Sequence, residues 1–174
     1  IGPGYRILAK VNWIFGKFAS IKTQNYKHAK SSGISENDAR KLAFAPHLNI
    51  GVFSLKKNSP IWETWQRNLK KTLSKGRVFG SEGLAINISV YLDNVETEFL
   101  PISHNWITSH LLPIYDQQNN IFREPNIPHQ EIGIIHLAAG IWKDGKDMRL
   151  DKNIKISLKT TNGNVIEKSL RFLS

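Results

Sequence analysis

Cysteine is absent from this chain of 174 residues, and methionine occurs only once. The lack of cysteine excludes a disulfide scaffold and a cysteine-ligated zinc site, and it is compatible with a reducing cytosol. Long hydrophobic runs are missing as well, so no stretch of about 18 apolar residues predicts a membrane span. The first ten residues lack the basic start and apolar core of a signal peptide. We expect a cytoplasmic protein and, since the chain begins at Ile1, a piece of a longer one.

Acidic residues are the minority, with 14 Asp and Glu against 24 Lys and Arg, which gives a net charge of +10. Such a surplus favours anionic partners, although a solvated basic surface explains it equally well. Basic residues gather in 67–75, where they form either a solvated helix face or a contact with anionic lipid at the inner face of the membrane. No RNA- or DNA-binding motif is present, so we expect no nucleic-acid partner.

Three helices are predicted from their end signals and apolar spacing. The first lies between the capping residue Ser35 and Pro46, and the third covers 82–92. The second begins at Ser59–Pro60 and ends at Gly76. It places four large apolar side chains on one helical stripe, namely Trp62, Trp65, Leu69 and Leu73.

Strands are predicted at 48–55, 98–101 and 132–138, while three prolines predict that 113–131 is mostly loop. The last residues, from 153 onward, predict a hairpin around the Asn162–Gly163 turn. Residues 1–20 carry an apolar and aromatic pattern of no definite type. The sequence therefore predicts a mixed α/β fold, with a mixed sheet, flanking helices and a C-terminal β-hairpin.

His136 follows the apolar run 132–135 and precedes Gly140 and Lys143. At the carboxyl end of a strand, a neutral imidazole is suited to a divalent metal and a lysine to a phosphate. A glycine lets the backbone approach a ligand closely. The alternative is a hydrogen-bonded histidine with a structural role only.

Three further groups of residues allow two interpretations each. Asn49 and Gly51 lie in a predicted strand for which neither has good propensity, so they either face a ligand or mark a bulge. Glu82 is either a functional acid or a first-turn residue that favours the helix dipole. Asn105 and Trp106 form either a sugar platform or a turn asparagine beside a core tryptophan.

Five segments, in this order, resemble the C-terminal half of GT-A-fold glycosyltransferases, and the chain is similar to glycosyltransferase family 8 and related bacterial sugar transferases. The family pattern is Asn-x-Gly-Val, a Trp-containing helix, an acid-led helix, Leu-Pro followed by Asn, and His followed by Gly and Lys. The matching segments are "NIGVF" (49–53), "WETW" (62–65), "SEGLAIN" (81–87), "LPISHNW" (100–106) and "HLAAGIWK" (136–143).

The resemblance implies a metal-dependent enzyme that transfers a sugar from a nucleotide-sugar donor, most often a UDP-sugar, to a glycan or lipid-linked acceptor. Residues 1–150 would form the acceptor-side part of the GT-A-like domain, and 151–174 a hairpin extension. Carried over by position, the resemblance implies that His136 is a ligand of Mn²⁺ or Mg²⁺ and that Lys143 and Gly140 lie at the diphosphate. Asn49 and Gly51 would face the sugar, with Glu82 as the catalytic residue beside the donor sugar. Asn105 and Trp106 would lie on the acceptor side.

The chain also departs from the family pattern. Gly83 stands where the family has glutamine, Lys143 lies seven residues after His136, and no Asp-x-Asp motif occurs. We expect the N-terminal nucleotide-binding half to be absent from these residues, so that the isolated chain is inactive. The alternative is a non-catalytic module that binds sugar or anionic lipid on a degraded transferase fold.

Overall fold

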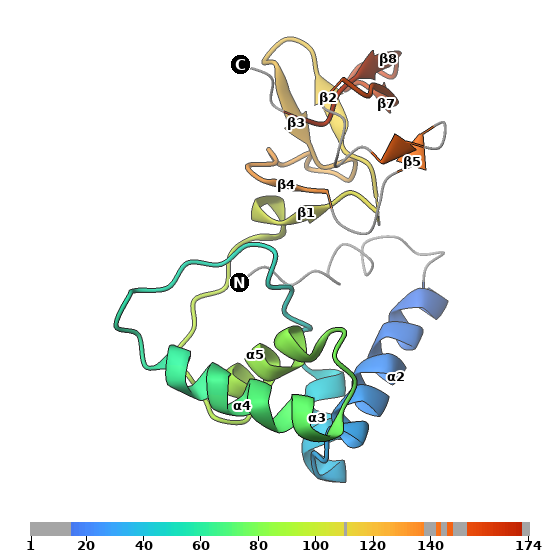
Figure 1. The fold of residues 1–174 in the computed structure, drawn as a ribbon. Helices are drawn as coiled ribbons and strands as arrows, with labels where there is room; N and C mark the ends of the chain where they lie inside the picture. The colour runs from blue at the N-terminus through green and yellow to red at the C-terminus, as the bar shows by residue number, and fades with distance from the viewer. Residues whose placement is uncertain (1–14, 110, 138–141, 144–145, 148–152, 172–174) are drawn as a thin grey trace. The chain divides into compact units, whose positions relative to one another are not determined.

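A computed structural model describes residues 15–109, 111–137, 142–143, 146–147 and 153–171 (Figure 1). It divides the chain into two compact units, Ile1–Leu100 and Pro101–Ser174. This boundary differs from the division after residue 150 that the sequence suggests. The described residues form four α-helices and eight short strands, so the predicted mixed α/β class is confirmed, while a GT-A-like arrangement stays a prediction.

The first unit is helical in its described part. α4 packs along α5 and α2 packs against α3, while α5 also contacts both α2 and α3 (Figure 1). None of these helices combines the length and hydrophobicity that a transmembrane span requires. The helices are α2 (Phe15–Ser31), α3 (Glu36–Phe44), α4 (Ile61–Lys75) and α5 (Ser81–Tyr91).

α5 is the central helix of this unit, since every residue from 84 to 90 is buried. Its two apolar faces belong to separate clusters, so the helix is held from both sides. The first cluster contains Ala29, Ile34, Ala39, Leu42, Leu84 and Ile88, and the second contains Leu48, Ile61, Ile86 and Val90. A helix fixed in this way holds the segments that surround its N-terminus.

The predicted helix ends agree with the structure at most positions. The Ser35 hydroxyl accepts a hydrogen bond from the Asp38 N–H at 3.2 Å, and α3 ends before Pro46. α4 follows Ser59–Pro60 and ends at Gly76 as predicted. Pro60 itself is the N-cap, however, and no side chain caps the helix there.

The apolar stripe predicted on α4 is buried only in part: Trp65 packs against the second core cluster, but the most buried residues of the helix lie elsewhere. Asn68 and Thr72 are buried, whereas Trp62 is 41% and Leu73 43% exposed. The rotation has a polar cause, because the Asn68 amide donates to the Ser89 hydroxyl of α5 at 3.0 Å. α4 therefore uses hydrogen bonds where the sequence pattern suggested apolar packing, and part of its stripe is left on the surface.

The strand predicted at 48–55 is wrong, because this segment turns. Gly51 donates its backbone N–H to the Asn49 side-chain oxygen at 2.8 Å, which closes a turn over these residues. Both backbone groups of Leu48 bond to the side chain of Asn87 rather than to another strand. A side-chain amide thus takes the place of a neighbouring strand.

Three other segments differ from the predictions in whole or in part. Residues 98–101 form no strand, and among the described residues 132–137 only Ile135–His136 form one. The segment 113–131 is mostly loop and turn as predicted, but it also contains two short strands, Ile114–Asp116 and Ile121–Arg123, which pair as an antiparallel hairpin. α2 covers residues for which no definite element was predicted.

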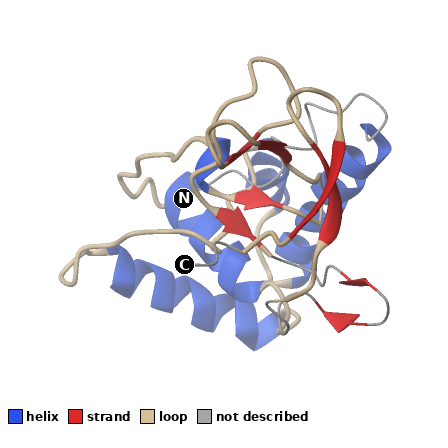
Figure 2. Ribbon diagram, turned by 90° about the horizontal axis from the view of Figure 1, so that it is seen from above, coloured by secondary structure: helices blue, strands red, loops and turns tan. Residues whose placement is uncertain are grey.

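The second unit contains two-stranded sheets in its described part (Figure 2). β1 pairs with β4 in parallel, and the other three pairs are antiparallel. A parallel bridge from Tyr115 to Thr160 joins the C-terminal hairpin to β2. The elements are η2 (Ile102–His104), β1 (Trp106–Ile107), β2 (Ile114–Asp116), β3 (Ile121–Arg123), β4 (Ile135–His136), β5 (Trp142–Lys143), β6 (Lys146–Asp147), β7 (Ile156–Lys159) and β8 (Val165–Lys168).

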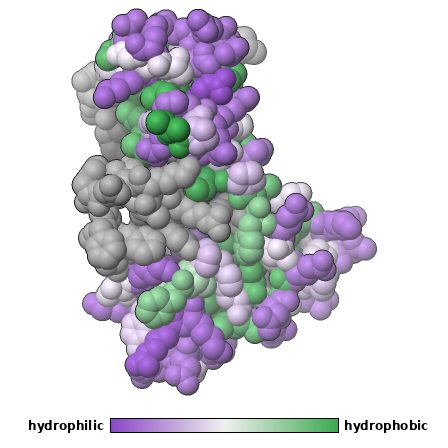
Figure 3. All heavy atoms as spheres, turned by 180° about the vertical axis from the view of Figure 1, so that it is seen from behind, coloured by the Kyte–Doolittle hydropathy of each residue, from purple (hydrophilic) through white to green (hydrophobic). Residues whose placement is uncertain are grey.

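The predicted C-terminal hairpin is confirmed as β7 and β8. Gly163 has a φ of 88°, the left-handed conformation that closes a short hairpin loop. Ile156 and Leu158 are buried on one face, while Ser157 and Lys159 are exposed. Figure 3 shows mainly hydrophilic residues around the end of the unit that carries this hairpin, as this alternation predicts.

Candidate functional site

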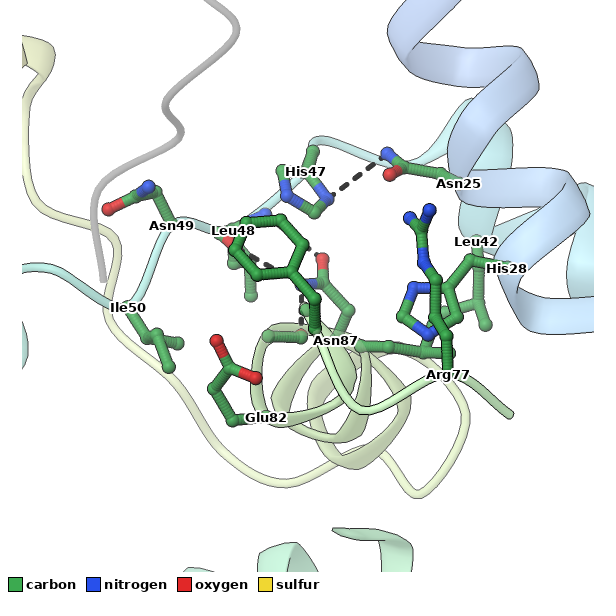
Figure 4. Close-up of a pocket in the computed structure, with 14 residues that line it drawn as sticks. Asn25, His28, Leu42, His47, Leu48, Asn49, Ile50, Arg77, Glu82 and Asn87 are labelled. Carbon is green, nitrogen blue, oxygen red and sulfur yellow. Dashed lines mark hydrogen bonds between the residues drawn. The ribbon is translucent and has the colours of Figure 1, made fainter. Parts of the chain in front are cut away.

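A cavity of about 280 Å³ lies in the first unit, at the N-terminus of α5 (Figure 4). Its walls come from four segments: α2, the end of α3 with the turn that follows it, the loop before α5, and α5 itself. Its polar side chains include two imidazoles, a guanidinium, a carboxylate and three amides. They belong to Asn25, His28, His47, Asn49, Arg77, Glu82 and Asn87.

Asn87 fixes the turn at the cavity wall. Its side-chain oxygen accepts from the Leu48 N–H at 2.9 Å, and its amide nitrogen donates to the Leu48 carbonyl at 3.1 Å. The same nitrogen donates to the Gly83 carbonyl at 2.7 Å, within α5. Because Leu48 is held by both backbone groups, the next residue, Asn49, is positioned at the cavity.

The two imidazoles of the cavity are neutral at pH 7. Burial lowers the pKa of His47 to about 4, and the charges of Lys22 and His28 act in the same direction. The Asn25 amide donates to His47 Nδ1 at 3.1 Å, so this nitrogen carries the lone pair. Burial, followed by the Arg77 guanidinium, likewise lowers the pKa of His28.

The two charged side chains of the cavity, Arg77 and Glu82, have opposite signs. Neither makes a side-chain hydrogen bond or an ion pair within the described part of the chain. In the view of Figure 4 they approach the cavity from different sides, with Arg77 near His28 and Glu82 toward Asn49 and Ile50. Among the described residues, the cavity therefore offers one ligand a cation and an anion that are not paired with each other or with another side chain.

The N-terminus of α5 is open at this cavity. Its N-cap is Gly80, with a φ of 82°, and no side chain caps the helix. A Cβ atom added at Gly83 would meet nothing within 4 Å. The first-turn N–H groups of a helix lack partners within the helix and carry its positive end.

The second unit holds the other group of predicted residues. His136 in β4 is half-buried, and its Nδ1 lies 2.9 Å from the Asn105 side-chain oxygen. Because that oxygen only accepts, Nδ1 carries the proton and Nε2 keeps the lone pair. Burial lowers the pKa of His136, so the imidazole is neutral at pH 7.

The parallel pairing of β1 and β4 explains how these two residues meet. Trp106 pairs with Ile135 and Ile107 with His136, so Asn105 lies next to Ile134 and is a diagonal neighbour of His136. Asn105 is 1% exposed and therefore serves as the partner of His136 rather than as an open contact for an acceptor.

The predicted acceptor role of Trp106 is corrected by its burial. This side chain is 0% exposed, and its indole N–H donates to the Leu111 carbonyl at 2.8 Å. Stacking on a sugar requires an open ring face, which a fully buried indole lacks. Trp106 is a core residue of the second unit.

The remaining predicted residues are placed as follows. Asn49 and Glu82 line the same cavity, whereas Gly51 is exposed in the adjoining turn and is not part of its wall. Lys143 belongs to β5, but its side chain and the whole of Gly140 lie outside the described residues.

His28, His47, Arg77 and Asn87 are cavity residues that sequence reasoning missed. Asn87 could have been predicted, because an asparagine inside an otherwise apolar helix segment indicates a buried amide with a backbone partner. The other three are brought together by helix packing, which the sequence pattern does not encode locally.

Comparison of the chain with protein-family models, with curated proteins and with solved structures finds no match. Within the described ranges, no group of three or more histidine, aspartate or glutamate side chains is arranged to hold a metal ion.

Proposed function

We propose that this chain is the sugar-binding part of a metal-dependent glycosyltransferase that uses a nucleotide-sugar donor. The observation that carries the proposal is the cavity of the first unit, whose wall includes both Asn49 and Glu82 although they come from separate segments. The resemblance assigns both residues to the donor sugar. Their presence in one cavity is what such a pair requires.

The chemistry of the cavity supports a sugar ligand. Glu82, which has no side-chain partner within the described part of the chain, can accept hydrogen bonds from sugar hydroxyls, and the side chain of Asn49 is a second polar group of the same wall. The cavity volume is close to the lower end of the range usual for small-molecule sites, about 300 Å³. A single sugar residue suits a site of this kind.

The pair of Asn105 and His136 is suited to provide one metal ligand, which is the imidazole of His136. The Asn105 oxygen fixes the tautomer of His136 and leaves Nε2 available, which is the outer-shell arrangement usual for metal-bound histidine. The remaining ligands would come from outside the described residues. Mn²⁺ or Mg²⁺ bound there would neutralise charge on the leaving diphosphate, together with Lys143.

Titration of the chain with glucose and galactose tests the sugar-binding part of this proposal. We expect binding that weakens about ten-fold or more in Glu82→Gln, since a hydrogen bond to a charged group contributes about 1.5–3 kcal/mol. Glu63→Gln is the matched control, because it removes an exposed first-turn glutamate from α4. Equal affinities of the wild type and Glu82→Gln would contradict the sugar-binding role.

The second candidate function is a non-catalytic module that binds sugar or anionic lipid. The missing Asp-x-Asp motif and Gly83 in place of glutamine favour it. Calorimetric titration with UDP, with and without Mn²⁺, distinguishes the two. Metal-dependent nucleotide binding supports the transferase, and sugar binding without it supports the module.

A further inference from the structure

Arg77 is the feature of the cavity that a neutral sugar leaves unexplained. Its guanidinium lines the cavity and has no carboxylate partner in the described part of the chain. Among the described residues of the cavity wall, the only acidic side chain is Glu82, which approaches from a different side in Figure 4. Arg77 is exposed at this wall, so its guanidinium is accessible to an anionic group of a ligand.

We propose that the cavity selects an acidic sugar, whose carboxylate or phosphate binds Arg77 while its hydroxyls bind Glu82 and Asn49. This inference rests on the proposed sugar-binding function and adds the substrate class. Arginine suits the task because its planar fork binds a carboxylate or a phosphate through two parallel hydrogen bonds.

The surroundings of Arg77 favour an anion. His28, next to it, is buried and bonds to the Ser81 hydroxyl at 3.5 Å, while His47 bonds to Asn25. Neither imidazole brings negative charge to this side of the cavity. The uncapped N-terminus of α5 begins at Gly80, and its positive end adds to the attraction. The Arg77 guanidinium and the positive end of α5 therefore both favour an anion on this side of the cavity, and the neutral imidazoles do not oppose it.

The opposite signs of the two charged residues also explain the selectivity. An anion that entered near Glu82 would meet a carboxylate, whereas at Arg77 it meets a guanidinium. A sugar with one acidic substituent therefore binds in one orientation, with its acid at Arg77 and its hydroxyls at Glu82.

The test is a titration of the full chain with glucose, glucuronate, glucose 6-phosphate and inorganic phosphate, followed by NMR or calorimetry. We expect glucuronate or glucose 6-phosphate to bind at least about ten-fold more tightly than glucose, and whichever is tighter identifies the acidic group. In Arg77→Gln the affinities for the acidic sugar and for glucose should become about equal, and Arg77→Lys should restore part of the preference. Lys70→Gln, which removes an exposed charge from α4, should keep the preference.

The outcomes separate this inference from the proposed function. Equal binding of glucose, glucuronate and glucose 6-phosphate to the wild type would overturn the acidic substrate class and leave sugar binding intact. If inorganic phosphate binds as tightly as glucose 6-phosphate and Glu82→Gln has no effect, sugar binding would be overturned and the cavity would be an anion site. A preference that survives in Arg77→Gln, with unchanged thermal unfolding, would overturn the role of Arg77.

Discussion

At the scale of single residues, the cavity depends on imidazoles that are kept neutral by burial. His47 accepts a hydrogen bond from Asn25, and a proton on that nitrogen would break the contact. The same protonation would place a new positive charge beside Lys22 and His28. Protonation of His47 therefore disfavours the folded state.

The pKa of His47 predicts an acid limit to stability. Its folded value of about 4 is below the ordinary value of 6.5, so the unfolded chain binds more protons between these two pH values. The stabilisation of the folded state by neutral His47 is fully present above pH 6.5. It is lost progressively as the pH falls from 6.5 to about 4, at about 1.4 kcal/mol per pH unit. Urea unfolding at several pH values measures this loss.

His47→Gln is the variant that isolates the effect, because a glutamine oxygen accepts from Asn25 and does not titrate. We expect its unfolding free energy to fall less than that of the wild type between pH 6.5 and pH 4. Asp116 does not obscure this window, since hydrogen bonds from Asn119 and Arg123 lower its pKa to about 2. Parallel pH profiles of the two proteins would refute the prediction.

At the scale of elements, α5 holds the cavity wall through one side chain. Asn87 is 4% exposed and satisfies the N–H and the carbonyl of Leu48, which is itself 0% exposed. In Asn87→Ala both backbone groups lose their partner in a buried place, which costs about 1–3 kcal/mol each. We expect the unfolding free energy to drop by about 2–4 kcal/mol and the amide hydrogen exchange of Leu48 to accelerate.

Asn58→Ala is the control for this prediction, because it removes an exposed amide from the loop before α4. Its unfolding free energy should stay within about 0.5 kcal/mol of the wild type. If Asn87→Ala lowered the unfolding free energy as little as Asn58→Ala does, the result would mean that water replaces the amide at Leu48. The turn at Asn49 would then not depend on α5.

The same contact shows why part of the fold was predictable from the sequence and part was not. Helix ends rest on local signals, such as the Ser35 cap and Pro46, and these were predicted well. The hairpin β7–β8 also carries its own turn at Asn162–Gly163. The segment at 48–55 has strand-like residues, but the hydrogen-bond partner of Leu48 is the Asn87 side chain. No pattern within that segment predicts this contact.

The candidate site follows the same rule. Asn49 and Glu82 were predicted through the order of motifs along the chain, which local sequence preserves. Arg77 and His28 reach the cavity because helices α2 and α5 pack together, and this packing is a long-range result. Trp106 was misassigned because an aromatic residue beside an asparagine looks the same in sequence whether it is exposed or buried.

At the scale of the whole molecule, the net charge of +10 acts together with the exposed part of the α4 stripe. Trp62 and Leu73 are 41% and 43% exposed, Lys70 is exposed on the flank of this stripe, and Lys71 is exposed on the other side of the helix. Apolar side chains flanked by lysine are typical of a surface that contacts anionic lipid. The whole-chain charge alone would give only a diffuse, salt-sensitive attraction.

Vesicle sedimentation separates these two contributions. We expect the chain to bind vesicles that contain phosphatidylglycerol and not vesicles of phosphatidylcholine alone. The pair Lys70→Gln and Lys71→Gln should weaken binding about ten-fold or more, because each basic residue near the surface contributes about 1 kcal/mol. The pair Lys27→Gln and Lys30→Gln removes the same charge from exposed positions of α2. If both pairs weaken binding equally, and Trp62→Ala has no effect, the attraction belongs to the net charge of the molecule and α4 has no specific part in it.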